Sequence, residues 1–207
     1  MMVLTLSGSF DRQERATAAA QPARLGSVQA LQEWDLVQRA QQFDASALAW
    51  LYQVYHPKIY NYAFLQLGNA QLAEDVASDV MVKVIESIGG FRFRGAPFAA
   101  WVFRIARNRI IDMHRRRRRR GEVQLDKEVA GREDPTTSVE QALDRGHLQA
   151  ALSRLTEEQR QVIVLRFIEG FDNASVARVL GRSQGSIKSL QHRALASLRR
   201  ILTEEGS

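Results

Sequence analysis

Hydrophobic residues recur at intervals of three and four along most of the chain between residues 33 and 203. This spacing keeps apolar side chains on one side of an α-helix, whereas a half-buried β-strand needs strict alternation. No segment alternates for long enough to predict a strand. The chain of 207 residues is long enough for two small domains. We therefore predict an all-α protein in which two small helical domains are joined by a flexible linker.

The helix predicted between Asn69 and Gly89 has the clearest hydrophobic stripe in the first half of the chain. Asn69 is a candidate N-cap, and Gly89 with Gly90 is a stop signal. The opposite face is acidic around one valine, and it can be either a solvated surface or a docking face for a basic partner. The stripe comprises Ala73, Val76, Ala77, Val80, Val84 and Ile88, and the opposite face comprises Asp75, Ser78, Asp79, Val82 and Glu86.

The segments before and after this helix are also predicted to be helical. Asp44 is a plausible N-cap, and Pro57 predicts a break or kink between two helices. After the sequence FRFRGAPF, Pro97 suits the first turn of a new helix. One side of that helix is predicted to pack through Ala99, Val102, Ala106, Ile110 and Met113, and another presents Arg104, Asn108, Asp112 and Arg115.

The second half of the chain has the spacing of a helix-turn-helix. Thr156 and Gln159 can form a capping box, and Gly170 closes the helix that they begin. A short helix over 173–180, a glycine turn and a longer helix entered through Ser183 follow. Polar side chains on the longer helix can bind bases and phosphates, although a helical hairpin with a solvated face would show the same pattern. The longer helix is predicted to pack through Ile187, Leu190, Ala194 and Leu198 and to present Gln184, Ser186, Lys188, Ser189, Gln191 and Arg193.

The positive charge of the chain is concentrated in one segment. The net charge is +6, but the segment from Arg92 to Arg120 holds eleven Arg and one acid, Asp112, so it carries +10 and the rest of the chain −4. Such a local excess is the electrostatic footprint expected for a polyanion. The six consecutive arginines over 115–120 sweep every side of a helix and must meet water or phosphate. The alternative is a solvated helix end that the macrodipole stabilises.

The composition disfavours several functional classes. The chain has no cysteine, and its four histidines lack a ligand-like spacing, so we expect no disulfide, no metal site and no cofactor. The acidic residues show no convergent spacing for catalysis, so we do not expect an enzyme. Residues 1–32 lack a signal-peptide pattern and are expected to form a mobile tail, with a short helix as the alternative. No apolar run approaches the roughly 20 residues that span a bilayer, so we expect a cytoplasmic protein.

Taken together, three segments resemble the extracytoplasmic-function class of bacterial RNA polymerase sigma factors. They are AEDVASDVMVKV, FRFRGAPFAAWVFRIARNRIIDMHRRR and LTEEQRQVIVLRFIEGFDNASVARVLGRSQGSIKSLQHRALASLRR, and their order and spacing are more specific than any one of them. The resemblance implies sigma domain two over 33–120, a linker over 121–146 and sigma domain four over 147–203. The linker carries a net charge of −4 and, by the same resemblance, is expected to run through the nucleic-acid channel of the polymerase as a charge mimic.

The resemblance also implies a mechanism. The acidic face around Val82 is expected to bind the clamp helices of the polymerase largest subunit, and the helix over 157–169 is expected to bind the flap of the other large subunit. The loop from Phe93 to Phe98, in which Gly95 permits close approach, is expected to receive an unstacked base of the minus-10 element, while Trp101 and Phe103 pack in the core. Core RNA polymerase and promoter DNA are thus the expected partners, and an anti-sigma factor is a further candidate.

The implied contacts form three groups. The polymerase-docking group is Asp75, Ser78, Asp79, Val82 and Glu86. The minus-10 group is Arg92, Phe93, Arg94, Gly95, Phe98, Arg104, Asn108, Asp112, Arg115, Arg116, Arg117 and Arg118. The minus-35 group is Ser183, Gln184, Ser186, Lys188, Ser189, Gln191 and Arg193.

The sequence also departs from the family pattern. Many members carry Lys-Ser-Arg-Leu-His-Arg where this chain has KSLQHR, which puts Leu190 where an arginine contact is common and Gln191 where a core leucine is common. The packed face of the reading helix is therefore open from sequence. In the docking helix, Ser78 and Ile85 stand where Gln and Trp are frequent.

Two other functional classes fit parts of the sequence. The segment LTEEQRQVIVLRFIEGFDNASVARVLGRSQGSIKS also looks like the DNA-binding output domain of LuxR-type response regulators, so a stand-alone helix-turn-helix regulator is the main alternative. That alternative needs a receiver or dimerising domain, whereas residues 33–120 predict helices and an arginine-rich aromatic segment. A nuclease is the third class, and it needs clustered carboxylates that the pattern does not supply.

Overall fold

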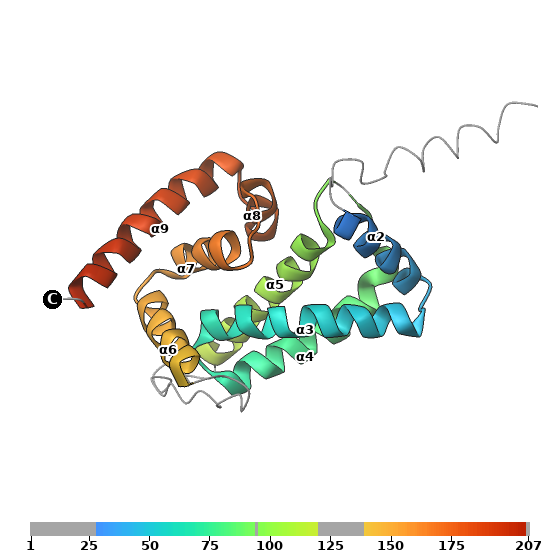
Figure 1. Ribbon diagram of the computed structural model, residues 1–207, viewed down its shortest axis with the longest axis horizontal. Coiled ribbons are helices and arrows are strands. Elements are labelled where there is room, and N and C mark those ends of the chain that lie inside the picture. Colours follow the sequence, from blue (N-terminus) through green and yellow to red (C-terminus); the bar gives the residue numbers. More distant parts are fainter. Residues whose placement is uncertain (1–27, 94, 120–138, 206–207) are drawn as a thin grey trace, which may run out of the picture.

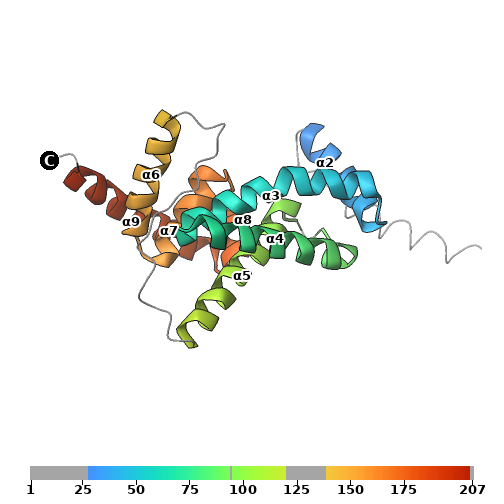
Figure 2. The same cartoon turned by 90° about the horizontal axis from the view of Figure 1, so that it is seen from below.

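The computed structural model describes residues 28–93, 95–119 and 139–205, and every regular element in that part of the chain is helical (Figures 1 and 2). The all-α prediction is confirmed. Most of the expected tail and most of the expected linker lie outside the described residues. The elements are α2 (Val28–Gln41), α3 (Ala45–Leu67), α4 (Ala70–Ser87), the 3-10 turn η1 (Ile88–Gly90), α5 (Phe98–Arg119), α6 (Val139–Ser153), α7 (Glu157–Ile163), the π-turn η2 (Val164–Ile168), α8 (Asn173–Leu180) and α9 (Gln184–Glu205).

The first half is a bundle in which α4 packs between α3 and α5, and α2 lies against α3. Both predicted N-caps are confirmed. The Asp44 carboxylate accepts hydrogen bonds from the backbone of Ser46 and Ala47, and the Asn69 side chain accepts one from Leu72. Each cap satisfies backbone donors that the first turn of a helix leaves unpaired.

The second helix of this bundle contains Pro57 but does not break, so the predicted division into two helices was wrong. A proline inside a helix removes one backbone donor and usually bends the helix. Pro57 and Gln53, one turn earlier, are both exposed, so the carbonyl of Gln53 that loses its helical partner can bond to water. Gly68, with a φ of 70°, ends α3 by donating its N–H to the carbonyl of Phe64.

Helix α6 starts at Val139, inside the segment 121–146 that the sequence predicts to be a linker with at most a short helical piece. The capping box of Thr156 and Gln159 at the start of α7 is confirmed. The next turn, η2, was not predicted. There the N–H of Glu169 donates to the carbonyl of Val164 at 2.9 Å, a step of five residues where an α-helix uses four.

The two halves also pack against each other. Helix α5 contacts α8, and the C-terminal part of α3 contacts α6 and α7 (Figures 1 and 2). The rings of Phe103 and Phe171 meet edge to face with their centroids 5.1 Å apart, and Nε of Arg107 donates to Oε1 of Gln161 at 3.1 Å. Consequently, one continuous hydrophobic core runs through both halves.

Candidate polymerase and nucleic-acid surfaces

All five residues of the polymerase-docking group lie on the exposed face of α4. The face exists because all six residues of the predicted inward stripe are buried on the other side of the helix, as predicted. At its centre, Val82 is 57% exposed and is surrounded by acidic side chains. One apolar contact among carboxylates suits a mixed polar and apolar protein interface.

The carboxylates of this face differ in their surroundings. Glu86 pairs with Lys83 of the same helix at 3.2 Å, and Asp75 accepts a 3.4 Å hydrogen bond from Gln71. Asp79 instead bonds to Arg109, which belongs to α5. Asp79 is therefore the docking residue that a side chain from another helix fixes.

The arginines of α5 point in three directions. Arg104 and Arg115 lie on the exposed side with Asn108 and Asp112, as predicted. Arg107 turns toward the second half of the chain, and Arg109 turns toward α4. The two arginines of this exposed side are eleven residues apart, or about three helical turns, so each can contact a different phosphate. Of the other arginines in the minus-10 group, Arg116 is exposed and Arg117 half-buried, while Arg94 and the side chain of Arg118 lie outside the described residues.

The aromatic residues around the loop before α5 form a packed cluster. The Phe98 ring lies 5.1 Å from that of Phe91 and 5.5 Å from that of Tyr55, measured between centroids, and Phe98 is only 4% exposed. Phe98 therefore cannot receive an unstacked base without leaving the core, and its place in the minus-10 group was wrong. The expectation that Phe103 packs in the core is confirmed, and Trp101 is half-buried.

The loop that leads into α5 leaves fewer side chains available to DNA. Arg92 is exposed, although its guanidinium donates to the carbonyl oxygens of Gly89 and Phe91 at 3.0 and 2.9 Å. Phe93 is half-buried, with its ring 5.6 Å from that of Trp34. Gly95 is exposed with a φ of 72°, a conformation that other residues rarely adopt. Among the described residues of the loop, the backbone of Gly95 and the ring of Phe93 are available to an incoming base.

The predicted helix-turn-helix is present. Asp172 caps α8 by accepting from the N–H of Ser175 at 2.8 Å, and Gly181, with a φ of 66°, makes the turn. Leu190 is 4% exposed, whereas Gln191 is half-buried. This answers the question that the KSLQHR sequence left open, because the leucine packs inward. The other inward residues are Ile187, Ala194 and Leu198; Ser183, Gln184, Lys188, Ser189 and Arg193 are exposed, and Ser186 is half-buried.

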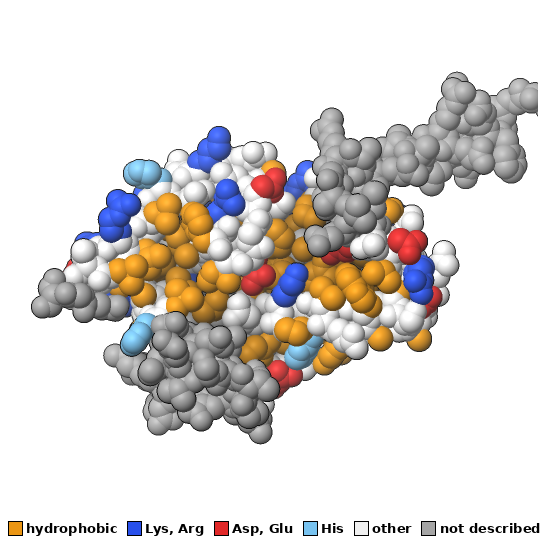
Figure 3. All heavy atoms as spheres, in the orientation of Figure 1, with side chains coloured by type: hydrophobic (Ala, Val, Ile, Leu, Met, Phe, Trp, Pro, Cys, Tyr) orange, Lys and Arg blue, Asp and Glu red, His pale blue; other side chains and the backbone are white. Residues whose placement is uncertain are grey.

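A space-filling view shows how the surface over α9 is divided (Figure 3). Lys and Arg side chains lie along the outer edge of α9, and hydrophobic side chains gather between α9 and α7. Leu195 and Leu202 on α9 are 39% and 53% exposed. This basic edge of α9 would attract a polyanion such as DNA.

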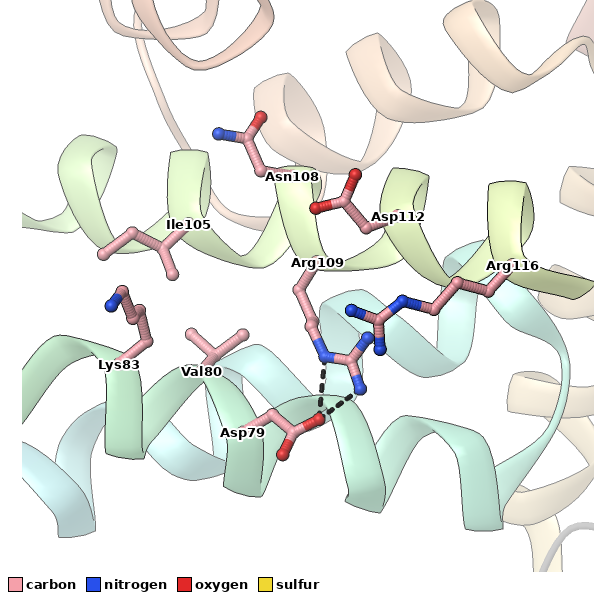
Figure 4. Close-up of a pocket in the computed structure, with 8 residues that line it drawn as sticks. All are labelled: Asp79, Val80, Lys83, Ile105, Asn108, Arg109, Asp112 and Arg116. Atoms are coloured by element: carbon pink, nitrogen blue, oxygen red, sulfur yellow. Dashed lines mark hydrogen bonds and ion pairs between the residues drawn. The ribbon is translucent and has the colours of Figure 1, made fainter.

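A hollow of about 560 Å³ lies between the packed helices α4 and α5 in the first half (Figure 4). Its walls carry Asp79 of the polymerase-docking group and three members of the minus-10 group. The two groups were assigned separately from sequence, and the structure makes them neighbours. The lining residues are Asp79, Val80, Lys83, Ile105, Asn108, Arg109, Asp112 and Arg116.

Two family profiles match the chain. The one described as Sigma-70 region 2 matches residues 51–120, and the one described as Sigma-70, region 4 matches residues 151–200. The ECF RNA polymerase sigma factor SigL of Mycobacterium tuberculosis is 32% identical over 164 residues, which cover 79% of this chain and 93% of SigL. The chain belongs to the extracytoplasmic-function class of the sigma-70 family.

Another relative and two solved structures agree with this assignment. This sigma factor is 36% identical over 174 residues to the ECF RNA polymerase sigma factor BldN of Streptomyces coelicolor, and the match covers 83% of this chain and 66% of BldN. The structure of CnrH in complex with the cytosolic domain of CnrY covers 82% of this chain and 96% of the solved one, with 25% identity and a TM-score of 0.64. RpoE from Bartonella quintana, solved with the anti-sigma factor NepR, covers 73% of this chain and 93% of the solved one, with 25% identity and a TM-score of 0.61.

This sigma factor is thus an alternative transcription initiation factor, and its class binds core RNA polymerase and promoter DNA. Neither matched profile is that of a LuxR-type regulator, so that alternative is not supported. Within the described residues, no group of three or more His, Asp and Glu side chains is placed to hold a metal ion. None of the described helices is both long enough and apolar enough to cross a membrane.

Sequence reasoning missed the role of Arg109. Arg109 was one arginine among eleven in the basic segment, and the face predicted for α5 did not include it. A signal was nevertheless present. Ile105, Arg109, Asp112 and Arg116 recur at i, i+4, i+7 and i+11, which places them along one side of the helix. That side lines the hollow toward α4 (Figure 4).

Proposed function

We propose that this sigma factor engages its partners through three separate surfaces. The polymerase-docking group on α4 binds the clamp helices, and the exposed members of the minus-10 group on α5 and the preceding loop bind the minus-10 element. The minus-35 group on α9 reads the minus-35 element. One observation carries the proposal: the whole polymerase-docking group, the α5 residues Arg104, Asn108, Asp112 and Arg115, and most of the minus-35 group lie on exposed faces of α4, α5 and α9, whose opposite faces are buried.

The proposed division of labour follows the expected domains. Domain two covers 33–120, domain four covers 147–203, and an acidic linker joins them through the nucleic-acid channel of the polymerase. Domain four is extended at its start by the part of α6 that precedes His147. The segment over 157–169, which contains α7 and η2, is the proposed contact for the flap. Promoter opening by these surfaces changes no covalent bond, so we assign the chain no enzymatic activity and place its action in the cytoplasm.

An anti-sigma factor is part of the proposal. RpoE from Bartonella quintana was solved with the anti-sigma factor NepR, and it shares the fold of this chain with a TM-score of 0.61. The exposed leucines of α9, Leu195 and Leu202, offer an apolar surface of the kind that protein partners cover.

The docking surface can be tested with purified protein and core RNA polymerase. Changing Asp75 and Asp79 to Lys and Val82 to Asp reverses two charges of the α4 face, brings the net charge of its five residues from −3 to 0, and removes its apolar contact. We expect this variant to lose co-elution with core polymerase at moderate salt. A control with Asp35→Lys and Gln38→Lys makes the same net charge change at exposed positions of α2, and it should co-elute like the parent. Equal loss in both variants, or in neither, would contradict the proposed surface.

The arginine run can be tested through the salt dependence of DNA binding. Changing Arg116, Arg117, Arg118 and Arg119 together to Ala should weaken holoenzyme binding to all promoters alike. The slope of log affinity against log salt should become shallower by about 0.9 for each phosphate that the variant no longer binds. Lys188→Ala tests the other DNA surface and should act more strongly on promoters with an intact minus-35 element. An unchanged salt slope in the quadruple variant would remove the run from the DNA interface.

A further inference from the structure

The ion pair between α4 and α5 connects two surfaces that the proposed function treats separately. Asp79 belongs to the polymerase-docking group, while Arg109 lies on the same helix as the minus-10 group. The side chain of Asp79 is 51% exposed and that of Arg109 is 30% exposed. Arg109 is thus covered more than its partner, so its contact with a further macromolecule is more restricted.

The geometry of this pair is asymmetric. Nε of Arg109 donates to Oδ2 of Asp79 at 2.7 Å, and Nη2 of Arg109 donates to the same oxygen. Both dashed lines in Figure 4 end on that one atom, and the second carboxylate oxygen points away from Arg109. Among the described residues, no hydrogen bond to Oδ1 of Asp79 is present. One oxygen is therefore held by Arg109, and the other is open to a partner.

The neighbouring charges have other roles. Lys83 pairs with Glu86 at 3.2 Å, and Asp112 pairs with Arg115 at 3.6 Å. Among the charged groups of the hollow, Arg109 is therefore the one that bonds to Asp79. Its two bonds fix the carboxylate, because a planar guanidinium accepts few relative orientations.

We propose that Arg109 is a positioning residue for polymerase docking. It holds Asp79 in one rotamer and aims the free Oδ1 at a Lys or Arg side chain of the polymerase. Val82, one turn along α4 and 57% exposed, is placed to pack against the aliphatic stem of that side chain. This inference rests on the proposed docking surface, since it assigns Arg109 no contact with the polymerase of its own.

Two physical effects of removing Arg109 oppose each other, and this makes the inference testable. Without Arg109, the Asp79 side chain must be ordered during docking, which weakens binding. Removing a positive charge beside an acidic face also increases its attraction for a basic partner, which strengthens binding. The second effect fades at high salt, because the Debye length falls to about 3 Å at 1 M. Loss of positioning does not fade in this way.

The experiment measures the affinity of the full chain for core RNA polymerase at low and high salt. The chain has no cysteine, so a dye on one cysteine added at the C-terminus can report binding by anisotropy. We expect Arg109→Gln to weaken binding about two- to tenfold at both salt concentrations. Arg109→Lys should recover part of the loss, because Lys can donate to the same oxygen. Arg199→Gln makes the same charge change at an exposed position of α9 outside the three groups and should leave polymerase affinity unaltered.

Asp79→Asn distinguishes a failure of the role assigned to Arg109 from a failure of the whole docking surface. If positioning is correct, adding Arg109→Gln to Asp79→Asn should cost little beyond Asp79→Asn alone. Tighter or unchanged binding of Arg109→Gln, while Asp79→Asn weakens binding, would overturn the role of Arg109 and keep the docking surface. No effect of either Asp79→Asn or the triple charge-reversal variant would overturn both. Thermal unfolding of each variant, followed by circular dichroism, shows that a loss of affinity is not a loss of fold.

Discussion

The interior of the first half is apolar, whereas the contact between the two halves combines apolar side chains such as Phe103 and Phe171 with buried polar ones. Around α4, Val76 and Val80 are at most 1% exposed and are enclosed by apolar neighbours. Where α3 and α5 meet α6 and α7, the buried side chains include Gln66, Gln149 and Gln161. Apolar burial stabilises strongly, whereas a polar contact replaces hydrogen bonds to water at a small net gain.

The polar contact is also incompletely satisfied. Among the described residues, Nε2 of Gln66, Oε1 of Gln149, Nε of Arg160 and the hydroxyl of Tyr62 are buried without a hydrogen-bond partner. Burial lowers the pKa of Arg160 and raises that of Glu169 to about 7. Each of these groups would recover hydration if the halves parted. The contact between the halves therefore combines an apolar part, in which Phe103 packs against Phe171, with a polar part that would recover hydration on separation.

The largest expected effect lies in the apolar interior. Ile59 is fully buried in α3, and Ile59→Ala should lower the free energy of unfolding by about 2–5 kcal/mol, because it removes buried methyl groups and leaves a cavity. Urea unfolding followed by circular dichroism measures the loss. Val82→Ala is the control, since Val82 is 57% exposed and should change stability by no more than about 0.5 kcal/mol. Equal effects of the two substitutions would contradict the claim that apolar burial stabilises the interior of the first half strongly.

The second largest expected effect is a pH dependence of the contact between the two halves, which arises from Glu169. Burial against α3 raises its pKa from 4.5 to about 7, although Lys58 and a hydrogen bond from Asn61 act the other way. Because the closed form binds this proton more tightly than a form with separated halves, acidification from pH 8 to pH 5 should favour closure. Raising the pH through 7 should favour separation. Since Glu169 is only half-buried, we expect the ratio of the two forms to change by roughly tenfold.

Energy transfer between dyes on the two halves can follow this change. Gln53→Cys on α3 and Ala196→Cys on α9 are both exposed sites in a chain without cysteine. Glu169→Gln should keep the chain closed and remove the dependence on pH. A pH dependence that survives in Glu169→Gln would belong to another group, such as one of the four histidines.

A smaller effect is expected from one hydrogen bond across the contact. Gln161→Ala removes the acceptor of the 3.1 Å bond from Arg107. A hydrogen bond of this kind contributes about 1 kcal/mol, so the closed form should lose about fivefold in population. The same dye pair measures this. Gln184→Ala changes an exposed glutamine outside the contact and should leave the energy transfer unaltered; a matching loss there would contradict the assignment to Gln161.

The features that sequence predicted well are those with local signals. The caps at Asp44 and Asn69 and the turn at Gly181 act on backbone groups within a few residues, so their effect is readable from the chain itself. The inward stripe of α4 is likewise local, because helical periodicity alone decides which residues share a face. The exposure of the whole polymerase-docking group follows from that stripe.

The features that sequence missed depend on neighbours from elsewhere in the chain. Phe98 is buried because Tyr55 and Phe91 enclose it, and nothing near residue 98 announces them. Pro57 fits within α3 because its side of the helix is exposed. Arg107 and Arg109 have the same side chain as the arginines of the exposed face, and only the positions of α7 and α4 give them different roles.

The π-turn of η2 changes the direction in which the chain leaves α7, and with it the orientation of the DNA-reading helix. Its bond from Glu169 to Val164 winds one more residue into the turn than an α-helical bond would. One residue corresponds to about 100° of rotation. Deleting one residue from 164–168 would restore the α-helical turn. It would rotate α8 and α9, with the entire minus-35 group, about the axis of α7. The direction in which this protein presents its reading helix is therefore encoded in a count of residues, independently of any side chain that touches DNA.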